Sequence, residues 1–395
     1  MRSPGSLRFR SLALIQFAVG TLLALGLPGL MAQAQVPDVQ LEEEVRVGSV
    51  WDDDRMLADV GGVAVFGDSL LLVLDRIELT IKVFDWEGDP VTRIGRYGSG
   101  PGEFKFPYRL RVRNDTIFVS NGGSGTLMLL NIDGDELTRL SFPRITVAGG
   151  TRIAKGPSGI LPDGALLGIP GATRPYLMED GKEYHPPILK VGSSGQILDT
   201  LCVWREIRGG SISTPGLQFP KFSLPAETPS DIYATSSSAG LVAVAEPVPP
   251  GHEAQYRITS IRHTGDTIFS RLYDFEPRRL DRQMGISLAL ENSRYAKESQ
   301  RILEAMAEAY AARRYVPPVS GLRIDSAGRI WVAGEKVPGE PVQWQVLTPL
   351  GEPLFRIQIP AGVRLWYTSG DLIWLEERDE LGVPFIVRYR IRDRD

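Results

Sequence analysis

The fold is decided by two consecutive stretches, GGVAVFGDSLLLVLD at residues 61–75 and IKVFDWEGDPVTRIGR at residues 81–96. Each contains two short apolar runs separated by a tight Gly/Asp turn, which is the pattern of a β-hairpin. The same arrangement follows in RLRVRNDTIFVS at residues 109–120 and TLMLLNIDGDELTRLSF at residues 126–142. The sequence therefore predicts repeated units of four antiparallel strands.

These units recur along the whole chain. Gly88 and Gly134, each in a turn between third and fourth strands, lie 46 residues apart, and insertions lengthen the later spacings. The turn between first and second strands occurs six times, at Gly67-Asp68, Asn114-Asp115, Asp163-Gly164, Ala239-Gly240, Ala327-Gly328 and Gly370-Asp371. A period in the forties with four strands per unit is typical of propeller blades, so we predict an all-β, six-bladed β-propeller over residues 39–395.

The last repeat is one strand short. It contains LWYTSGDLIWLEE (365–377) and PFIVRYRI (384–391), after which the chain ends. The stretch VQLEEEVRV, Val39 to Val47, is extended and rich in branched residues but belongs to no repeat. We expect it to complete the sixth blade, because this would close the ring by an N-terminal strand and remove open strand edges.

Residues 279–315 interrupt the β pattern between the fourth and fifth blades. Their composition turns to Ala, Glu, Arg, Leu and Met, and Ile302, Met306 and Tyr310 fall near helical spacing. The pattern predicts a helical insertion that ends before Pro317-Pro318. Because its apolar positions must be buried, we expect them to pack on the channel mouth as a lid or wall of a binding site.

Residues 1–34 have the three parts of a signal peptide. Arg2, Arg8 and Arg10 precede a long apolar run, and Ala32-Gln33-Ala34 offers the small-x-small pattern for cleavage. An uncleaved anchor is the alternative, since the apolar run approaches the length that spans a bilayer. Cleavage predicts a periplasmic or secreted protein without a stable membrane span. A single cysteine, Cys202, suits an oxidising compartment.

Removal of the signal leaves 41 basic and 48 acidic residues. Nucleic-acid binding is therefore not expected, because it needs an excess of positive charge. We expect a monomer whose partner is an unidentified ligand or protein.

The junction GRYGSGPGEFKFP, residues 95–107, is followed by an apolar strand, an Asn-Asp turn and another strand. This arrangement resembles the junction of NHL-repeat proteins and is similar to that of exported bacterial six-bladed propellers of mostly unassigned function. LRIDSAGRIWVAGE at residues 322–335 is a weaker second copy. The resemblance implies a binding scaffold and carries no catalytic residue to this chain.

Loop lengths indicate which face carries function. The turns within each hairpin are short, whereas the long segments connect second to third strands or one blade to the next. Propeller geometry places these long connections at one end of the strands, here called the loop-rich face. Binding sites usually occupy elaborated loops on a rigid scaffold, although such loops could also merely plug the channel.

Candidate ligand-binding residues are four arginines and two histidines. Arg109, Arg152, Arg323 and Arg364 fall, like Arg111, in predicted innermost strands, and could bind a carboxylate or phosphate or instead pair with the chain's own acids. His185 and His252 fall in long loops of neighbouring blades. The triplet Asp52-Asp53-Asp54 lacks the spacing of a calcium loop and predicts a solvated turn. No catalytic residue, metal site or cofactor is indicated.

We therefore expect an exported binding scaffold rather than an enzyme, with recognition on the loop-rich face. The alternative is a propeller hydrolase or lyase of the lactonase or amidating-lyase kind, since the fold by itself does not decide function.

Overall fold

The computed structural model describes the chain from residue 36 to residue 393 with internal gaps. The described residues are 36–121, 126–141, 144–147, 150–153, 159–168, 183–185, 187–194, 196–203, 206–207, 211–213, 221–223, 233–236, 239–247, 254–292, 297, 299–311 and 315–393. The predicted signal peptide, residues 1–34, lies outside them, as does His252.

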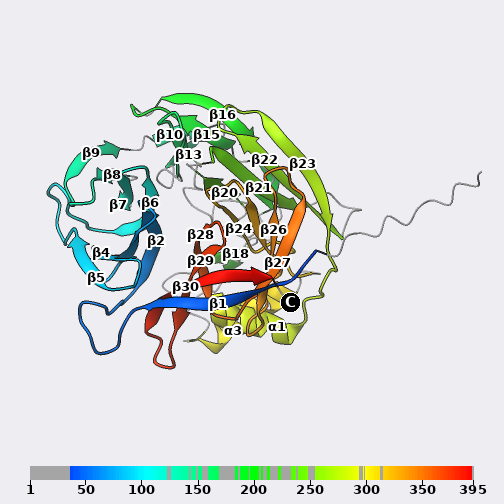
Figure 1. Cartoon of the computed structure of the whole chain (residues 1–395). Coiled ribbons are helices and arrows are strands. Elements are labelled where there is room, and N and C mark those ends of the chain that lie inside the picture. Colours follow the sequence, from blue (N-terminus) through cyan, green and yellow to red (C-terminus); the bar gives the residue numbers. More distant parts are fainter. Residues whose placement is uncertain are drawn as a thin grey trace, which may run out of the picture. The chain divides into compact units, whose positions relative to one another are not determined.

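Six four-stranded antiparallel sheets follow one another around a ring, so the fold is a six-bladed β-propeller (Figure 1). Blade 1 contains β2 (Val60–Phe66), β3 (Leu70–Asp75), β4 (Thr80–Phe84) and β5 (Pro90–Ile94). Blade 2 contains β6 (Pro107–Arg113), β7 (Thr116–Asn121), β8 (Thr126–Leu130) and β9 (Glu136–Ser141). Blade 3 contains β12 (Gly159–Ile160), β13 (Leu166–Gly168), β15 (Pro187–Val191) and β16 (Ile197–Val203).

The second half of the ring has the same order. Blade 4 contains β20 (Tyr233–Ser236), β21 (Leu241–Pro247), β22 (Gln255–Arg262) and β23 (Thr267–Asp274). Blade 5 contains β24 (Gly321–Ile324), β25 (Ile330–Ala333), β26 (Val342–Leu347) and β27 (Pro353–Ile359). Blade 6 contains β28 (Arg364–Ser369), β29 (Leu372–Arg378), β30 (Pro384–Asp393) and, as its fourth strand, β1 (Val39–Val47).

Three short two-stranded sheets lie in the connections. They are β10 (Arg144–Val147) with β11 (Gly150–Ile153), β14 (Glu183–Tyr184) with β17 (Glu206–Ile207), and β18 (Ser211–Ser213) with β19 (Lys221–Ser223). Arg152 lies in β11, which corrects the expectation that it belongs to an innermost strand. Val147 pairs with Gly150, so the chain reverses here and forms a separate hairpin before β12 begins blade 3.

The hairpin turns have the geometry that their sequences predict. Gly67 and Asp68 both have positive φ, 58° and 55°, as a type I′ turn requires to match the twist of its strands. The strands between such turns bury apolar side chains on both faces: Leu72 and Ile81 of blade 1 share one cluster with Leu110 of blade 2. The core therefore lies between adjacent blades, as face-to-face packing of sheets requires.

The N-terminal strand β1 pairs antiparallel with β30, from Val39 opposite Asp393 to Val47 opposite Ile386. Strands from the two ends of the described chain thus lie side by side in one blade (Figure 1). This supplies the fourth strand that the last sequence repeat lacks.

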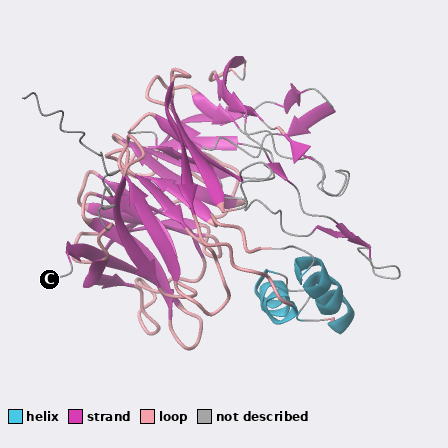
Figure 2. Cartoon of the chain, turned by 90° about the vertical axis from the view of Figure 1, so that its right-hand side faces the viewer, coloured by secondary structure: helices cyan, strands magenta, loops and turns pink. Residues whose placement is uncertain are grey.

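The segment between β23 and β24 contains two described helices, α1 (Arg282–Asn292) and α3 (Gln300–Ala311). They lie to one side of the strands, as Figure 2 shows. Ile302, Met306 and Tyr310 of α3 pack with Ala289 of α1, so the helices form a hairpin with a small core of its own. This corrects the expectation that these side chains pack on the channel mouth, because the neighbouring helix α1 already buries them.

Candidate functional site

Three of the predicted arginines lie on first strands of different blades. Arg109 is half-buried in β6, Arg323 lies in β24, and Arg364 begins β28. Arg323 donates from Nη1 to the carbonyl of Leu322 at 2.8 Å, and the Arg364 guanidinium lies 3.9 Å from the centroid of the Trp366 ring. Both guanidinium groups therefore have contacts within the chain, and an anion-binding role for these arginines stays a prediction.

The structure describes only one of the two predicted histidines, so their relative placement is not tested. His185 follows β14 and is exposed, whereas His252 and the side chain of Arg152 lie outside the described part of the chain.

The acidic triplet Asp52-Asp53-Asp54 forms a turn: Asp52 Oδ1 accepts the Asp54 N–H at 3.0 Å, and Arg93 pairs with Asp54 at 3.0 Å. Among the described residues, no group of three or more His, Cys, Asp or Glu side chains is arranged to hold a metal ion.

The junction at residues 95–107 is fixed by hydrogen bonds. Glu103 accepts the Gly100 N–H at 2.8 Å and Nε of Arg96 at 2.9 Å, and Asn121 Oδ1 accepts two backbone N–H groups from the same loop. Phe104 is completely buried in the core between blades 1 and 2. This loop therefore joins two blades rigidly, which is a structural role.

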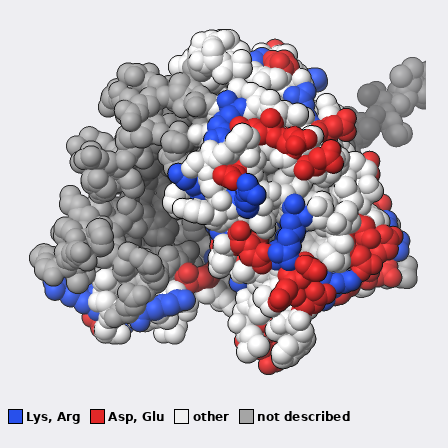
Figure 3. Space-filling view, turned by 90° about the vertical axis from the view of Figure 1, so that its left-hand side faces the viewer, with Lys and Arg blue, Asp and Glu red and all other residues white. Residues whose placement is uncertain are grey.

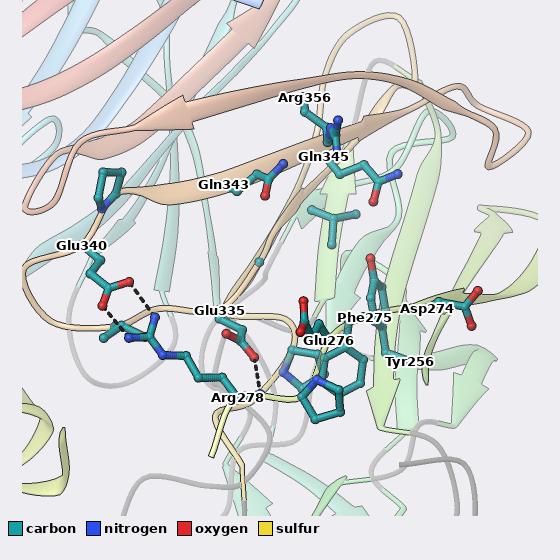
Figure 4. Close-up of a pocket in the computed structure, with 16 residues that line it drawn as sticks. Tyr256, Asp274, Phe275, Glu276, Arg278, Glu335, Glu340, Gln343, Gln345 and Arg356 are labelled. Carbon is teal, nitrogen blue, oxygen red and sulfur yellow. Dashed lines mark hydrogen bonds and ion pairs between the residues drawn. The ribbon is translucent and has the colours of Figure 1, made fainter. Parts of the chain in front are cut away.

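A pocket of about 770 Å³ lies between blades 4 and 5, toward the loop-rich face. Its volume is in the range of small-molecule sites. The walls come from the start of β22, the connection after β23, the connection between β25 and β26, and side chains of β26 and β27 (Figure 4). The lining residues are Tyr256, Asp274, Phe275, Glu276, Pro277, Arg278, Pro318, Val332, Gly334, Glu335, Val337, Glu340, Pro341, Gln343, Gln345 and Arg356.

An ion pair joins two walls of the pocket. Arg278, after β23, donates from both terminal nitrogens to the two carboxylate oxygens of Glu340, each at 2.6 Å (Figure 4). Two parallel hydrogen bonds fix the relative orientation of the two side chains in addition to the attraction between their charges. The hydrogen bond and the charge of Arg278 lower the pKa of Glu340. The contact therefore holds the 334–341 connection against the base of the helical hairpin.

Two further carboxylates lie beside this ion pair. Glu335 accepts only the backbone N–H of Arg278, at 3.4 Å, and Glu276 has no hydrogen-bond or ion-pair partner among the described residues. Burial raises the pKa of Glu335, and the negative charges of Glu340 and Glu276 raise it further, although Arg278 opposes them. The pocket therefore holds negative charge that the described chain does not neutralise.

Aromatic side chains form the opposite wall. The rings of Tyr256 and Tyr273 stack with centroids 5.5 Å apart, and Phe275 lies 6.2 Å from Tyr256. Tyr256 is 7% exposed, and burial raises the pKa of its hydroxyl. That hydroxyl has no hydrogen-bond partner among the described residues and points into the pocket toward β26 (Figure 4).

Arg356 links the pocket to the start of the described chain. It donates from Nη2 to the carbonyl of Val36 at 3.2 Å and forms an ion pair with Asp38 at 3.3 Å. Its charge is therefore already partly engaged by the segment before β1.

Of the predicted site residues whose side chains the structure describes, none lines this pocket. The signal that could have revealed it is GEKVPGEPV, residues 334–342, a Pro- and Gly-rich connection with two glutamates facing the long insertion. Its length is modest beside the other connections, and no sequence pattern places Tyr256 opposite it.

The loop-rich face also carries exposed apolar side chains. Five large ones lie in its connections, with exposed fractions from 68% to 93%: Trp51, Ile77, Tyr97, Phe106 and Leu381. These connections belong to blades 1, 2 and 6, away from the pocket in the chain order. Exposed apolar side chains gathered on one face are typical of contact surfaces.

On the side of the molecule that Figure 3 shows, acidic and basic side chains are interspersed. Ion pairs in the connections before and after blade 1 include Arg55 with Asp52 at 3.4 Å and Arg96 with Glu103 at 2.9 Å. Within the part of the chain that the structure describes, no helix is long and apolar enough to cross a bilayer.

Comparison with known proteins supports the fold. A family model described as a 6-bladed beta-propeller matches residues 52–143, which span blades 1 and 2. No curated protein matches the sequence significantly.

Solved structures extend the similarity to the whole ring. A member of the duf4221 family from Bacteroides vulgatus has a TM-score of 0.56 at 10% identity, covering 91% of this chain and 100% of that one. A protein named as exported, from Bacteroides fragilis, has a TM-score of 0.50 at 15% identity, covering 90% and 96%. An aldose sugar dehydrogenase from Streptomyces coelicolor has a TM-score of 0.45 at 14% identity, covering 90% and 99%. At these identities the similarity to the two Bacteroides proteins shows a common fold and nothing finer.

Proposed function

We propose that this chain is an exported β-propeller binding protein that recognises its ligand or protein partner on the loop-rich face. The observation that carries the proposal is the pocket between blades 4 and 5, whose walls are fixed by the Arg278–Glu340 ion pair. A pocket of this size, lined by aromatic and apolar side chains with a few polar groups, is typical of small-molecule sites. The exposed apolar residues of blades 1, 2 and 6 offer a second contact area on the same face.

Export is proposed from residues 1–34, whose basic start, apolar run and small-residue cleavage pattern are those of a signal peptide. A structural neighbour named as exported agrees with this proposal. Cleavage would leave a propeller beginning a few residues before β1, in the periplasm or outside the cell.

We favour binding over the alternative of a lactonase- or lyase-like enzyme because two of the pocket's four carboxylates are already engaged within the chain. Glu340 is held by Arg278, and Asp274 accepts Nε2 of Gln255 at 2.7 Å, which leaves Glu276 and Glu335 to attract a ligand. Fold similarity to enzymes does not transfer their chemistry.

The test is a thermal-shift profile against a collection of amines, sugars, carboxylates, nucleotides and short peptides. We expect at least one class to raise the melting temperature of the wild-type chain but not of Gln343→Trp, which fills the pocket from β26. Thr138→Trp, on an exposed position of the outer strand β9, is the matched control and should respond like the wild type. No stabilising class, or shifts that persist in Gln343→Trp, would show that the pocket is not the binding site.

A further inference from the structure

We propose that the pocket between blades 4 and 5 takes an organic cation, an ammonium or guanidinium group carried on an aliphatic stem. This inference rests on the proposed binding function and specifies the chemistry of its ligand. It follows from the charges, the aromatic wall and one unpartnered buried hydroxyl.

The charge of the pocket is the first argument. Four carboxylates line it, and two of them are engaged within the chain, Glu340 by Arg278 and Asp274 by Gln255. Of the two lining arginines, Arg278 is occupied by Glu340, and Arg356 pairs with Asp38 outside the pocket lining. Glu276 and Glu335 remain without a cationic partner in the described chain, so a bound cation would supply the missing charge.

The aromatic wall is the second argument. Tyr256, stacked on Tyr273, and Phe275, 6.2 Å from Tyr256, give the pocket an aromatic wall. Ring faces attract cations electrostatically, and more strongly where water is excluded. Val332 and Val337 are buried lining residues that could contact the aliphatic part of the same ligand.

The Tyr256 hydroxyl is the third and independent argument. It belongs to a side chain more than nine-tenths buried, it has no partner among the described residues, and it is directed into the pocket (Figure 4). Because this hydroxyl opens into the pocket and has no protein partner, a ligand that donates or accepts a hydrogen bond there gains one without breaking another. An N–H of an ammonium or guanidinium group fits as donor, with the side-chain oxygens of Gln343 and Gln345 across the pocket as further acceptors.

Titration calorimetry with matched probes tests the class of ligand. Butylamine and butylguanidine are compared with neutral butanol, and a capped Gly-Gly-Arg-Gly-Gly peptide distinguishes a basic side chain from a free amine. We expect the cations, and not butanol, to bind, with affinity that falls as NaCl is raised. If the peptide binds more tightly than butylguanidine, the cation comes from a protein partner. If butylguanidine binds more tightly than the peptide, the cation comes from a free small molecule.

Substitutions locate the site. Glu335→Gln should weaken cation binding about tenfold, the loss of roughly one partly buried ion pair. Tyr256→Phe should weaken it about fivefold and leave the melting temperature unchanged, because the hydroxyl has no protein partner to lose. Glu380→Gln is the control, since this exposed carboxylate of the β29–β30 connection lies outside the pocket lining.

The inference and the proposed function can fail separately. If butanol or a sugar binds as well as the cations, or if Glu335→Gln binds cations unchanged, the cation inference is wrong. The binding function then still stands if another class stabilises the wild type but not Gln343→Trp. If no class does so, both are wrong.

Discussion

The guanidinium of Arg388 in β30 donates a hydrogen bond from Nε to the Glu44 carboxylate of β1 at 3.0 Å, joining residues at the two ends of the propeller sequence. The same guanidinium lies 4.3 Å from the ring centroid of Trp86 in blade 1 and donates to its carbonyl at 2.9 Å. Arg388 is 7% exposed, so these contacts are shielded from water. One side chain thus connects both strands of the closure to the next blade.

Removal of β1 is expected to destabilise the whole ring. A chain that begins at Ser49 loses the partner of β30, which exposes a strand edge and apolar residues that Val39 and Val47 cover, such as Ile357 and Ile386. We expect a loss on the order of several kcal/mol in unfolding free energy, a large share of typical domain stability. Chemical denaturation of this chain and of a control that begins at Val36 measures the difference, and equal stabilities would mean that β1 is not needed for closure.

Acid should weaken the closure through Glu43 and Glu44. The Arg46 hydrogen bond lowers the pKa of Glu43, and for Glu44 the contacts of Arg390 and Arg388 outweigh burial, which alone would raise it. A carboxyl whose pKa is lowered by folding stabilises the fold fully above its unfolded pKa, about 4.3, and this stabilisation is lost as pH falls through the folded pKa. The melting-temperature difference between wild type and Glu44→Gln should therefore be largest at neutral pH and shrink below about pH 4.

Glu380→Gln is the control for this pH series, because Glu380 has no hydrogen-bond or ion-pair partner among the described residues. Its melting temperature should follow that of the wild type at every pH. A Glu44→Gln difference that stays constant with pH would mean that the substitution acts through packing rather than charge.

Gly351, in the turn between β26 and β27, should not tolerate a side chain. Its φ is +80°, and a Cβ would lie 2.6 Å from the buried ring of Phe269 in blade 4. Gly362 has the same φ but open space around it. Both Ala substitutions strain the backbone by about 1–2 kcal/mol, and Gly351→Ala should cost about 1–3 kcal/mol more for overpacking. Equal losses by denaturant titration would show that Phe269 moves aside freely.

The helical hairpin should be separable from the propeller. The apolar side of α3 packs on α1, Met284 and Leu288 of α1 also contact Val337 near the base of the hairpin, and Arg279 and Tyr315 form a bridge there. Replacing residues 281–313 with a Gly-Ser linker should leave the β-sheet circular dichroism largely intact, because no blade loses a strand. It should weaken ligand binding if the hairpin shapes the pocket from Pro277 to Pro318. Unfolding of the propeller would instead identify the hairpin as part of its core.

Cys202 should be unreactive in the folded protein. Burial raises the pKa of its thiol to about 12, and the carboxylate of Glu246 adds to the effect. Because the thiolate is the reactive form, iodoacetamide at pH 8 should label Cys202 slowly in native protein and rapidly in denaturant. Equal rates would indicate that β16 opens readily.

Local chemistry in the sequence determined the repeated architecture. Each blade is built from strands close in sequence, and the turns between them need residues that accept positive φ, as Gly67 and Asp68 do. The number of blades and the orphan strand VQLEEEVRV follow from counting such turns. The helical character of the 279–315 segment is equally local, although the sequence did not show that α1 buries the apolar side of α3.

The candidate site was decided by tertiary structure. Tyr256, Arg278, Glu335 and Gln345 come from two blades and two connections, and only the placement of blade 4 against blade 5 brings them around one pocket. No periodic pattern marks such residues, because each satisfies local rules that many other positions also satisfy. Conversely, Arg109, Arg323 and Arg364 stand out in the sequence as charges on inner strands, but they lie in different blades and outside this pocket. The repeated blades can be predicted from the sequence because turns and strands depend on residues close together in the chain. A pocket depends on contacts between segments far apart in the chain, and these contacts form only when the ring closes.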